Sequence, residues 1–123
     1  MLGTARLMAF IATRDGVRAR LFYEATLGLR VISDDDFALA LDVAGTILRV
    51  QKVGAFVPHQ FTALGWQVPD IAAAVAALVE KGVVFERFPD CGQDEQGIWR
   101  SPSGASVAWF KDPDGNILSL TEF

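Results

Sequence analysis

The chain has 123 residues and a mass of 13.3 kDa, the size of one domain that buries roughly 65% of its unfolded surface. Its net charge is −4, and its 11 Lys and Arg residues are scattered, so we expect neither a nucleic-acid partner nor a membrane surface. Cys91 is the only cysteine, and the apolar run at 7–12 is too short to span a membrane, which favours a cytoplasmic protein.

The chain opens with a predicted strand and helix. Residues 8–15 (MAFIATRD) are strand-like and end in Asp15, where a helix-like stretch begins that Gly28 ends. The spacing of the apolar residues predicts that three of them form the buried stripe of this helix: Val17, Leu21 and Phe22.

An extended run at 29–33 and a strand at 37–41 follow, and they lead into the segment DVAGTILRV (42–50). Asp and Gly in the pattern D-x-x-G predict a tight turn, because glycine readily takes a positive φ, and an apolar strand follows the turn. This part of the chain therefore predicts a β-hairpin.

The second half repeats this order. Residues 63–70 (ALGWQVPD) predict a strand that ends in Asp70, the N-cap of a helix that Gly82 closes. The buried stripe of that helix is predicted to be Ile71, Ala74, Val75, Leu78 and Val79. An extended run at 83–88, a strand at 105–110 and a second hairpin, DPDGNILSL (112–120), complete the copy.

Two motifs matched in the same order indicate an internal duplication. We expect one α+β domain over residues 1–123, with a first βαβββ module at 1–53, a linker at 54–62 and a second βαβββ module at 63–123. Each module would place its helix on one sheet face, and the other faces would form a shared cup.

This pattern resembles the vicinal oxygen chelate superfamily, which includes glyoxalase I, bleomycin-resistance proteins and extradiol dioxygenases. The resemblance rests on DGVRARLFYEATLGL (15–29), GWQVPDIAAAVAALVEKGV (65–83) and FKDPDGNILSLTEF (110–123), and with the repeat it covers almost the whole chain. It implies paired βαβββ modules, a concave site and often a homodimer.

Metal-dependent members usually take His near the start of each module and Glu on its last strand. Carried over by position, the resemblance places Met8 and Arg49 at these sites in the first module and Ala63 and Ser119 in the second. None of the four is a normal ligand for a divalent ion. The sequence therefore predicts no metal and no other cofactor.

The remaining candidates for chemistry are weak. His59 lies in the linker beside Pro58, and alternation sends Glu122 to the sheet face opposite Ser119. The run Asp34–Asp36 and the pair Asp112 and Asp114 are interpreted as turn-forming carboxylates rather than cation ligands. Cys91 has no neighbouring base in sequence.

Strand alternation predicts a mostly apolar, small-molecule site. The residues predicted to line it are Met8, Phe10, Arg49, Gln51, Ala63, Gln67, Ser119 and Thr121, with Ile47, Gly65 and Ile117 on the same face. Arg49 would attract an anionic group, although a salt bridge within the chain is an alternative role. The tryptophans Trp66, Trp99 and Trp109 could stack on a ligand or belong to the core, and the polar stretch 89–97 is predicted to be a mobile loop.

Three functions remain open. The first is a metal-free protein that binds an apolar or anionic small molecule in the cup. The second is a lyase or ring-cleaving dioxygenase-like enzyme that uses a non-standard metal site or acid–base residues, with Glu95, Glu122 and His59 as candidates. The third is a structural or partner-binding domain whose cup is filled by Met8, Phe10 and the tryptophans.

Overall fold

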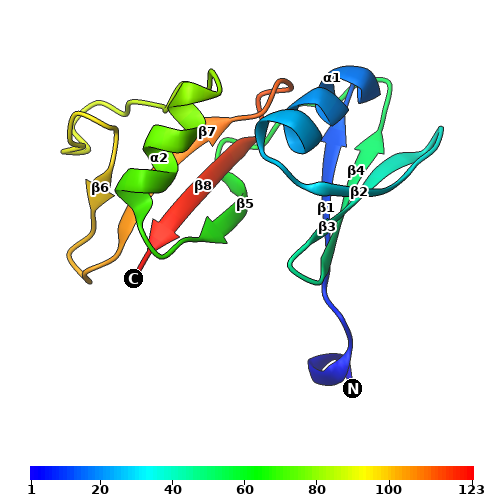
Figure 1. Ribbon diagram of the computed structural model, residues 1–123, viewed down its shortest axis with the longest axis horizontal. Helices are drawn as coiled ribbons and strands as arrows, with labels where there is room; N and C mark the ends of the chain where they lie inside the picture. The colour runs from blue at the N-terminus through cyan, green and yellow to red at the C-terminus, as the bar shows by residue number, and fades with distance from the viewer. The chain divides into compact units, whose positions relative to one another are not determined.

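A computed structural model describes all residues, 1–123, as two compact units, Met1–Val57 and Pro58–Phe123. Each unit contains one four-stranded mixed sheet with a helix on one of its faces (Figure 1). No helix in the structure is both long enough and apolar enough to cross a membrane.

The first unit begins with a short 3-10 helix and then forms a sheet in the order β1-β4-β3-β2. Strand β1 runs parallel to β4, and the other neighbours are antiparallel. Its elements are η1 (Leu2–Thr4), β1 (Met8–Thr13), α1 (Gly16–Arg20), η2 (Leu21–Thr26), β2 (Arg30–Asp34), β3 (Ala38–Val43) and β4 (Thr46–Lys52).

The first helix differs from its prediction in which residues it buries. After one turn and a half, α1 continues as the π-helical segment η2, and the residues that it buries completely are Ala19 and Tyr23. Val17 and Leu21 are 76% and 62% exposed, so the predicted stripe is wrong at these two positions. Small Ala19 lets the helix approach the sheet closely, and Tyr23 fills the space one turn further on.

The first hairpin forms as predicted. Strands β3 and β4 are joined by a tight turn in which Ala44 and Gly45 have φ values of 49° and 90°. The Asp42 carboxylate accepts a hydrogen bond from the Gly45 N–H at 3.2 Å, so the D-x-x-G pattern supplies both the turn and its side-chain support.

The second unit repeats the topology with the order β5-β8-β7-β6, and β5 runs parallel to β8. Its elements are β5 (Thr62–Gln67), α2 (Ile71–Glu80), β6 (Trp99–Arg100), β7 (Ser106–Lys111) and β8 (Ile117–Glu122). Helix α2 lies across β7 and β8 (Figure 1).

Both ends of α2 match the prediction. The Asp70 carboxylate accepts a hydrogen bond from the Ala73 N–H at 3.1 Å, and Gly82, with a φ of 93°, closes the helix. Ile71 and Val75 are fully buried against the sheet, whereas Val79, at the end of the predicted stripe, is exposed.

The predicted strand at 83–88 is wrong. This segment makes only one isolated bridge, between Phe85 and Phe110, and the fourth strand of the sheet is Trp99–Arg100 instead. The α+β fold of two tandem βαβββ modules is nevertheless confirmed, because each unit pairs four strands in the same order with one helix covering a face.

Candidate functional site

Each sheet has one face that packs against its helix and one that does not, which we call the open face. In the first unit, the cross-strand register places Phe10, Arg49 and Ala40 side by side in one row of the open face. Met8 and Gln51 lie two residues away along the same strands as Phe10 and Arg49, and therefore on the same face. The structure thus brings together the four residues predicted for this module.

The open face of the first unit is accessible. Met8 and Phe10 are 43% and 53% exposed, so neither side chain is buried on this face. On the other face, residues at the alternate strand positions are almost fully buried under the helix: Ile11, Leu39, Leu41, Leu48 and Val50.

Arg49 is half-buried and forms no salt bridge or hydrogen bond within the chain. Its charge does help to lower the pKa of Asp35, but that carboxylate already accepts hydrogen bonds from the Phe37 and Ala38 N–H groups, the larger causes of the shift. By contrast, Arg30 on the same face is paired with Asp42 at 3.3 Å. The guanidinium of Arg49 therefore keeps all its donors for another partner.

In the second unit, two rows cross the open face. One row contains Gly65, Ser119 and Trp109, and the next contains Gln67, Thr121, Val107 and Trp99. The structure therefore brings Gln67, Ser119 and Thr121 together, as predicted for this module. Ala63 differs, because it lies where the register between β5 and β8 shifts and has no residue opposite it.

Three aromatic rings on this face form a cluster that the sequence showed only in part. Trp109 contacts Trp99, with ring centroids 6.0 Å apart, and Phe88 edge-on, with centroids 5.4 Å apart. Trp66 lies elsewhere, on the helix-covered face, since it pairs with Leu120. Phe88 lies in the run at 83–88 that was predicted to be extended, but the sequence alone does not show that its ring contacts Trp109.

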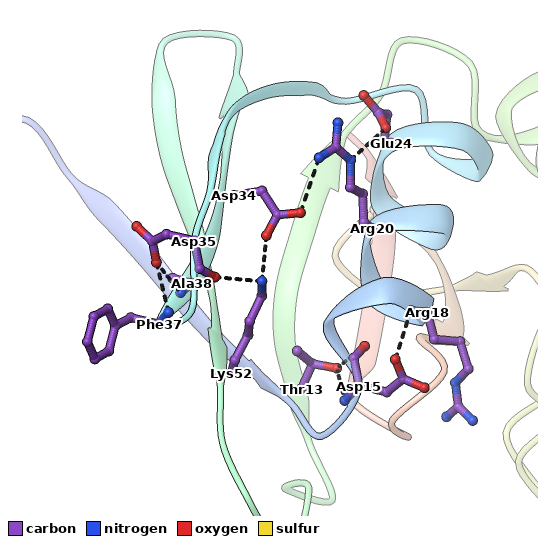
Figure 2. Close-up of polar contacts among 10 residues, drawn as sticks. All are labelled: Thr13, Asp15, Arg18, Arg20, Glu24, Asp34, Asp35, Phe37, Ala38 and Lys52. Atoms are coloured by element: carbon purple, nitrogen blue, oxygen red, sulfur yellow. Dashed lines mark hydrogen bonds and ion pairs between the residues drawn. The ribbon is translucent and has the colours of Figure 1, made fainter.

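The acidic run Asp34–Asp36 has a structural role in the first unit. Asp34 Oδ1 accepts a hydrogen bond from Lys52 Nζ at 2.5 Å, and Asp34 Oδ2 pairs with Arg20, which also pairs with Glu24 (Figure 2). The hydrogen bond from Lys52 is the largest cause that holds the pKa of Asp34 below its ordinary value. The cluster links α1, β2 and β4 rather than binding a cation.

The residues suggested for acid–base chemistry lie apart from the open faces. Glu122 accepts a hydrogen bond from the Ile71 N–H at 2.9 Å, which confirms that it points to the α2 side of its sheet. His59 is exposed and stacks on Phe61, with centroids 4.8 Å apart. Asp112 accepts hydrogen bonds from the Asp114 and Asn116 N–H groups, as expected of a turn-forming carboxylate.

Glu95 lines a groove of about 520 Å³. The groove lies between α2 and the segments that follow this helix. The groove is mostly apolar and contains none of the residues predicted to line the ligand site. Its lining residues are Val75, Ala76, Val79, Val83, Val84, Phe85, Arg87, Glu95 and Gln96.

Side-chain hydrogen bonds to the backbone hold the loop 89–97 in place. The Gln93 amide bonds to the backbone of Glu86, Phe88 and Gly97, and the Asp94 carboxylate accepts from the Gln96 and Ile98 N–H groups. The Arg87 guanidinium donates to the carbonyl groups of Asp94 and Glu95. The composition of the loop gave no sign of this support.

Two tandem βαβββ units, each with an open sheet face that carries polar and aromatic side chains, define a class of small α+β proteins. The chain belongs to the Glyoxalase/Bleomycin resistance protein/Dioxygenase superfamily, whose family description matches residues 5–120. No curated protein matches the sequence.

Solved structures of the same superfamily align over nearly the whole chain. A superfamily member from Sphaerobacter thermophilus is 25% identical, with 100% of both chains covered and a TM-score of 0.78. A glyoxalase/bleomycin resistance protein/dioxygenase from Alicyclobacillus acidocaldarius is 18% identical, with 98% and 92% covered and a TM-score of 0.74. A lactoylglutathione lyase from Agrobacterium tumefaciens is 15% identical, with 97% and 93% covered and a TM-score of 0.71. The last two similarities are evidence for the fold alone.

The residues present do not fit the divalent metal ion that the family implies. The four positions that the resemblance assigns to metal ligands carry a thioether, a guanidinium, a methyl group and a hydroxyl, at Met8, Arg49, Ala63 and Ser119. No three His, Cys, Asp or Glu side chains in the chain are grouped to hold a metal ion. A guanidinium about 4 Å from a divalent ion would also oppose its binding by roughly 8 kcal/mol at an effective dielectric of 20.

Proposed function

We propose that this chain is a small-molecule-binding protein that works without a metal ion, and that Arg49 binds an anionic group of its ligand. The observation that carries the proposal is a half-buried guanidinium on an open sheet face with no partner inside the chain. Polar groups that lose contact with water usually find a hydrogen-bond partner, and charged groups have the strongest need of one.

The neighbours of Arg49 favour a ligand that is apolar beside its anionic group. Phe10 lies directly opposite Arg49 on β1 and Ala40 directly opposite on β3, so the cation is flanked by apolar surface. Met8 and Phe10 are exposed on this face and can cover the apolar part of a ligand. A carboxylate accepts two parallel hydrogen bonds from a guanidinium, which makes an apolar carboxylate the best match.

The test is a titration with 1-naphthoate, followed by calorimetry and by amide shifts in NMR spectra. We expect Arg49→Gln to weaken binding at least about tenfold, because hydrogen bonds to charged groups contribute about 1.5–3 kcal/mol. Arg30→Gln is the matched control, since Arg30 lies on the same face but is already paired with Asp42, and it should change the affinity less than about twofold. Equal binding by Arg49→Gln and the unmodified protein would overturn the proposal.

We also propose that the protein is a homodimer, as its superfamily resemblance implies. Sedimentation velocity measures the mass directly, and a monomer at all accessible concentrations would contradict the proposal.

A further inference from the structure

The open face of the second unit contains a hydroxyl group in an unusual position. Ser119 is only 7% exposed, yet its hydroxyl makes no hydrogen bond within the chain. Its neighbours Leu118 and Leu120 are buried on the α2 side, so Ser119 points to the open face. Every fully buried side-chain oxygen in the chain has a partner, which indicates that this hydroxyl still reaches the surface.

Gly65 creates the space that this hydroxyl occupies. The two residues are directly opposite each other, and a Cβ built on Gly65 would lie 2.8 Å from Ser119 Oγ. Any other residue at position 65 would therefore displace the hydroxyl. Because Gly65 has no side chain, no side chain from β5 covers the Ser119 hydroxyl on the open face.

The other neighbour of Ser119 in the same row is aromatic. Trp109 lies directly opposite it on β7, and such cross-strand pairs have Cβ atoms about 5 Å apart. Phe88 and Trp99 support the Trp109 ring from its sides, and neither indole N–H forms a hydrogen bond within the chain. One substituted ring could thus contact Trp109 and reach Ser119 at the same time.

Charge on this face favours a neutral ligand group. Lys111 lies two residues along β7 from Trp109, and its ammonium group is already paired with Glu86 at 3.3 Å. The polar side chains in the neighbouring row are Gln67 and Thr121, both uncharged and without a hydrogen bond to another side chain. This face therefore offers hydrogen bonds and stacking but no free cation.

We infer that the open face of the second unit binds a neutral, planar aromatic group with a hydrogen-bonding substituent, its ring against Trp109 and its substituent at Ser119 Oγ. The inference rests on the proposed function, because it names a class of small molecule that such a binding protein would take on this face. Stacking on indole rings favours flat aromatic molecules, and the hydroxyl selects those that can donate or accept a hydrogen bond. A phenol has both properties.

The test uses 2-naphthol as the probe and the full chain labelled with ¹⁵N. The chain has three indole N–H groups, and we expect those of Trp99 and Trp109 to shift on titration while that of Trp66 does not. Ser119→Ala should weaken binding about fivefold, the effect of one neutral hydrogen bond. Trp109→Leu should weaken it about tenfold through loss of stacking.

Two controls keep the result clear. Trp66→Phe changes a ring on the opposite face of β5 and should leave the affinity for 2-naphthol unchanged. Gly65→Ala should weaken binding as Ser119→Ala does, so the inference can still be tested if Trp109→Leu does not fold. Unchanged affinity in Ser119→Ala, or a shift of the Trp66 indole alone, would overturn the inference.

The two probes distinguish a failure of this inference from a failure of the proposed function. Equal binding of 1-naphthoate by Arg49→Gln and the unmodified protein, together with weaker binding of 2-naphthol by Ser119→Ala, would overturn the role proposed for Arg49 and support this inference. Binding of 1-naphthoate through Arg49 without any binding of 2-naphthol would overturn only this inference. The same holds if a second copy of the chain covers the face, in which case the indole signals would change with protein concentration and not with the probe.

Discussion

Lys52 reaches Asp34 across the backbone of Gly16, at the start of α1. A Cβ at position 16 would lie 2.6 Å from Cε of Lys52. The glycine therefore leaves room for the Lys52 side chain to extend to the Asp34 carboxylate. Arg20 pairs with the other oxygen of Asp34 at 3.1 Å (Figure 2). A single carboxylate thus joins one helix residue and one residue of β4 at the end of β2.

This arrangement makes part of the folding stability depend on pH. The pKa of Asp34 is lower in the folded chain than in the unfolded one, chiefly through Lys52, so the ionised form stabilises the fold. That contribution is present above the unfolded pKa of about 3.9 and is lost as the pH falls through the folded value. We expect Asp34→Asn to lower the unfolding free energy by about 1 kcal/mol near neutral pH and by less near about pH 2.

Urea denaturation at the two pH values measures the difference. Asp36→Asn is the matched control, because Asp36 is an exposed neighbour in the same acidic run and forms no ion pair. A loss in Asp34→Asn that is the same at both pH values would show that packing, and not the charge of Asp34, is responsible.

At the scale of elements, the first helix shows where apolar periodicity fails as a guide. The sequence offers Val17 and Leu21 as core residues, but the helix turns Ala19 and Tyr23 to the sheet and changes to π-helical geometry at Leu21. A π-helix has a wider turn than an α-helix, so residues beyond the change no longer follow the 3.6-residue spacing. Periodicity also gives little weight to alanine, which matters here for its small size.

Ala19→Leu therefore tests the packing of this helix. The larger side chain must enter a space that is fully closed, and we expect a loss of about 1–3 kcal/mol in unfolding free energy. Val17→Leu, on the exposed side of the same helix turn, should change it by less than about 0.5 kcal/mol. Urea denaturation of both variants would contradict this packing if their stabilities were reversed.

Helix α2 was predictable because its signals are local. Asp70, the apolar stripe and Gly82 lie within 13 residues, and each acts through its own backbone turn. The hydrogen bond from the Ile71 N–H to Glu122 could not be predicted, since the two residues are 51 positions apart. The bridge of Phe85 to Phe110 was missed for the same reason.

The N-cap of α2 contributes to stability by an amount that is known for such caps. Asp70→Ala removes the acceptor for the Ala73 N–H and should lower the unfolding free energy by about 1 kcal/mol. Asp70→Asn keeps an oxygen in place and should retain most of that stability. If both substitutions had the same effect in thermal unfolding, the cap would not be the source of the stability.

Across the whole molecule, the repeat in the sequence was enough to predict the fold and the faces but not the role of each site residue. Alternation correctly placed Phe10 with Arg49 and Ser119 with Thr121, because side chains change face at every strand position. It did not reveal that Arg49 has no partner or that Gly65 makes room for Ser119. These depend on distances between strands, and the shift at Ala63 shows how one extra residue alters them.

The absence of carboxylate and imidazole at the inherited ligand positions has a consequence for the intact protein. Untagged protein incubated with Fe²⁺, Mn²⁺, Ni²⁺ and Zn²⁺ and then desalted should retain almost no metal, because no three ligand-type side chains are grouped and Arg49 repels cations. Mass spectrometry measures the ratio of metal to protein, with each ion passed through the same column without protein as the control. Retention near one ion per chain would contradict the metal-free proposal and would direct attention first to Glu122 and His59.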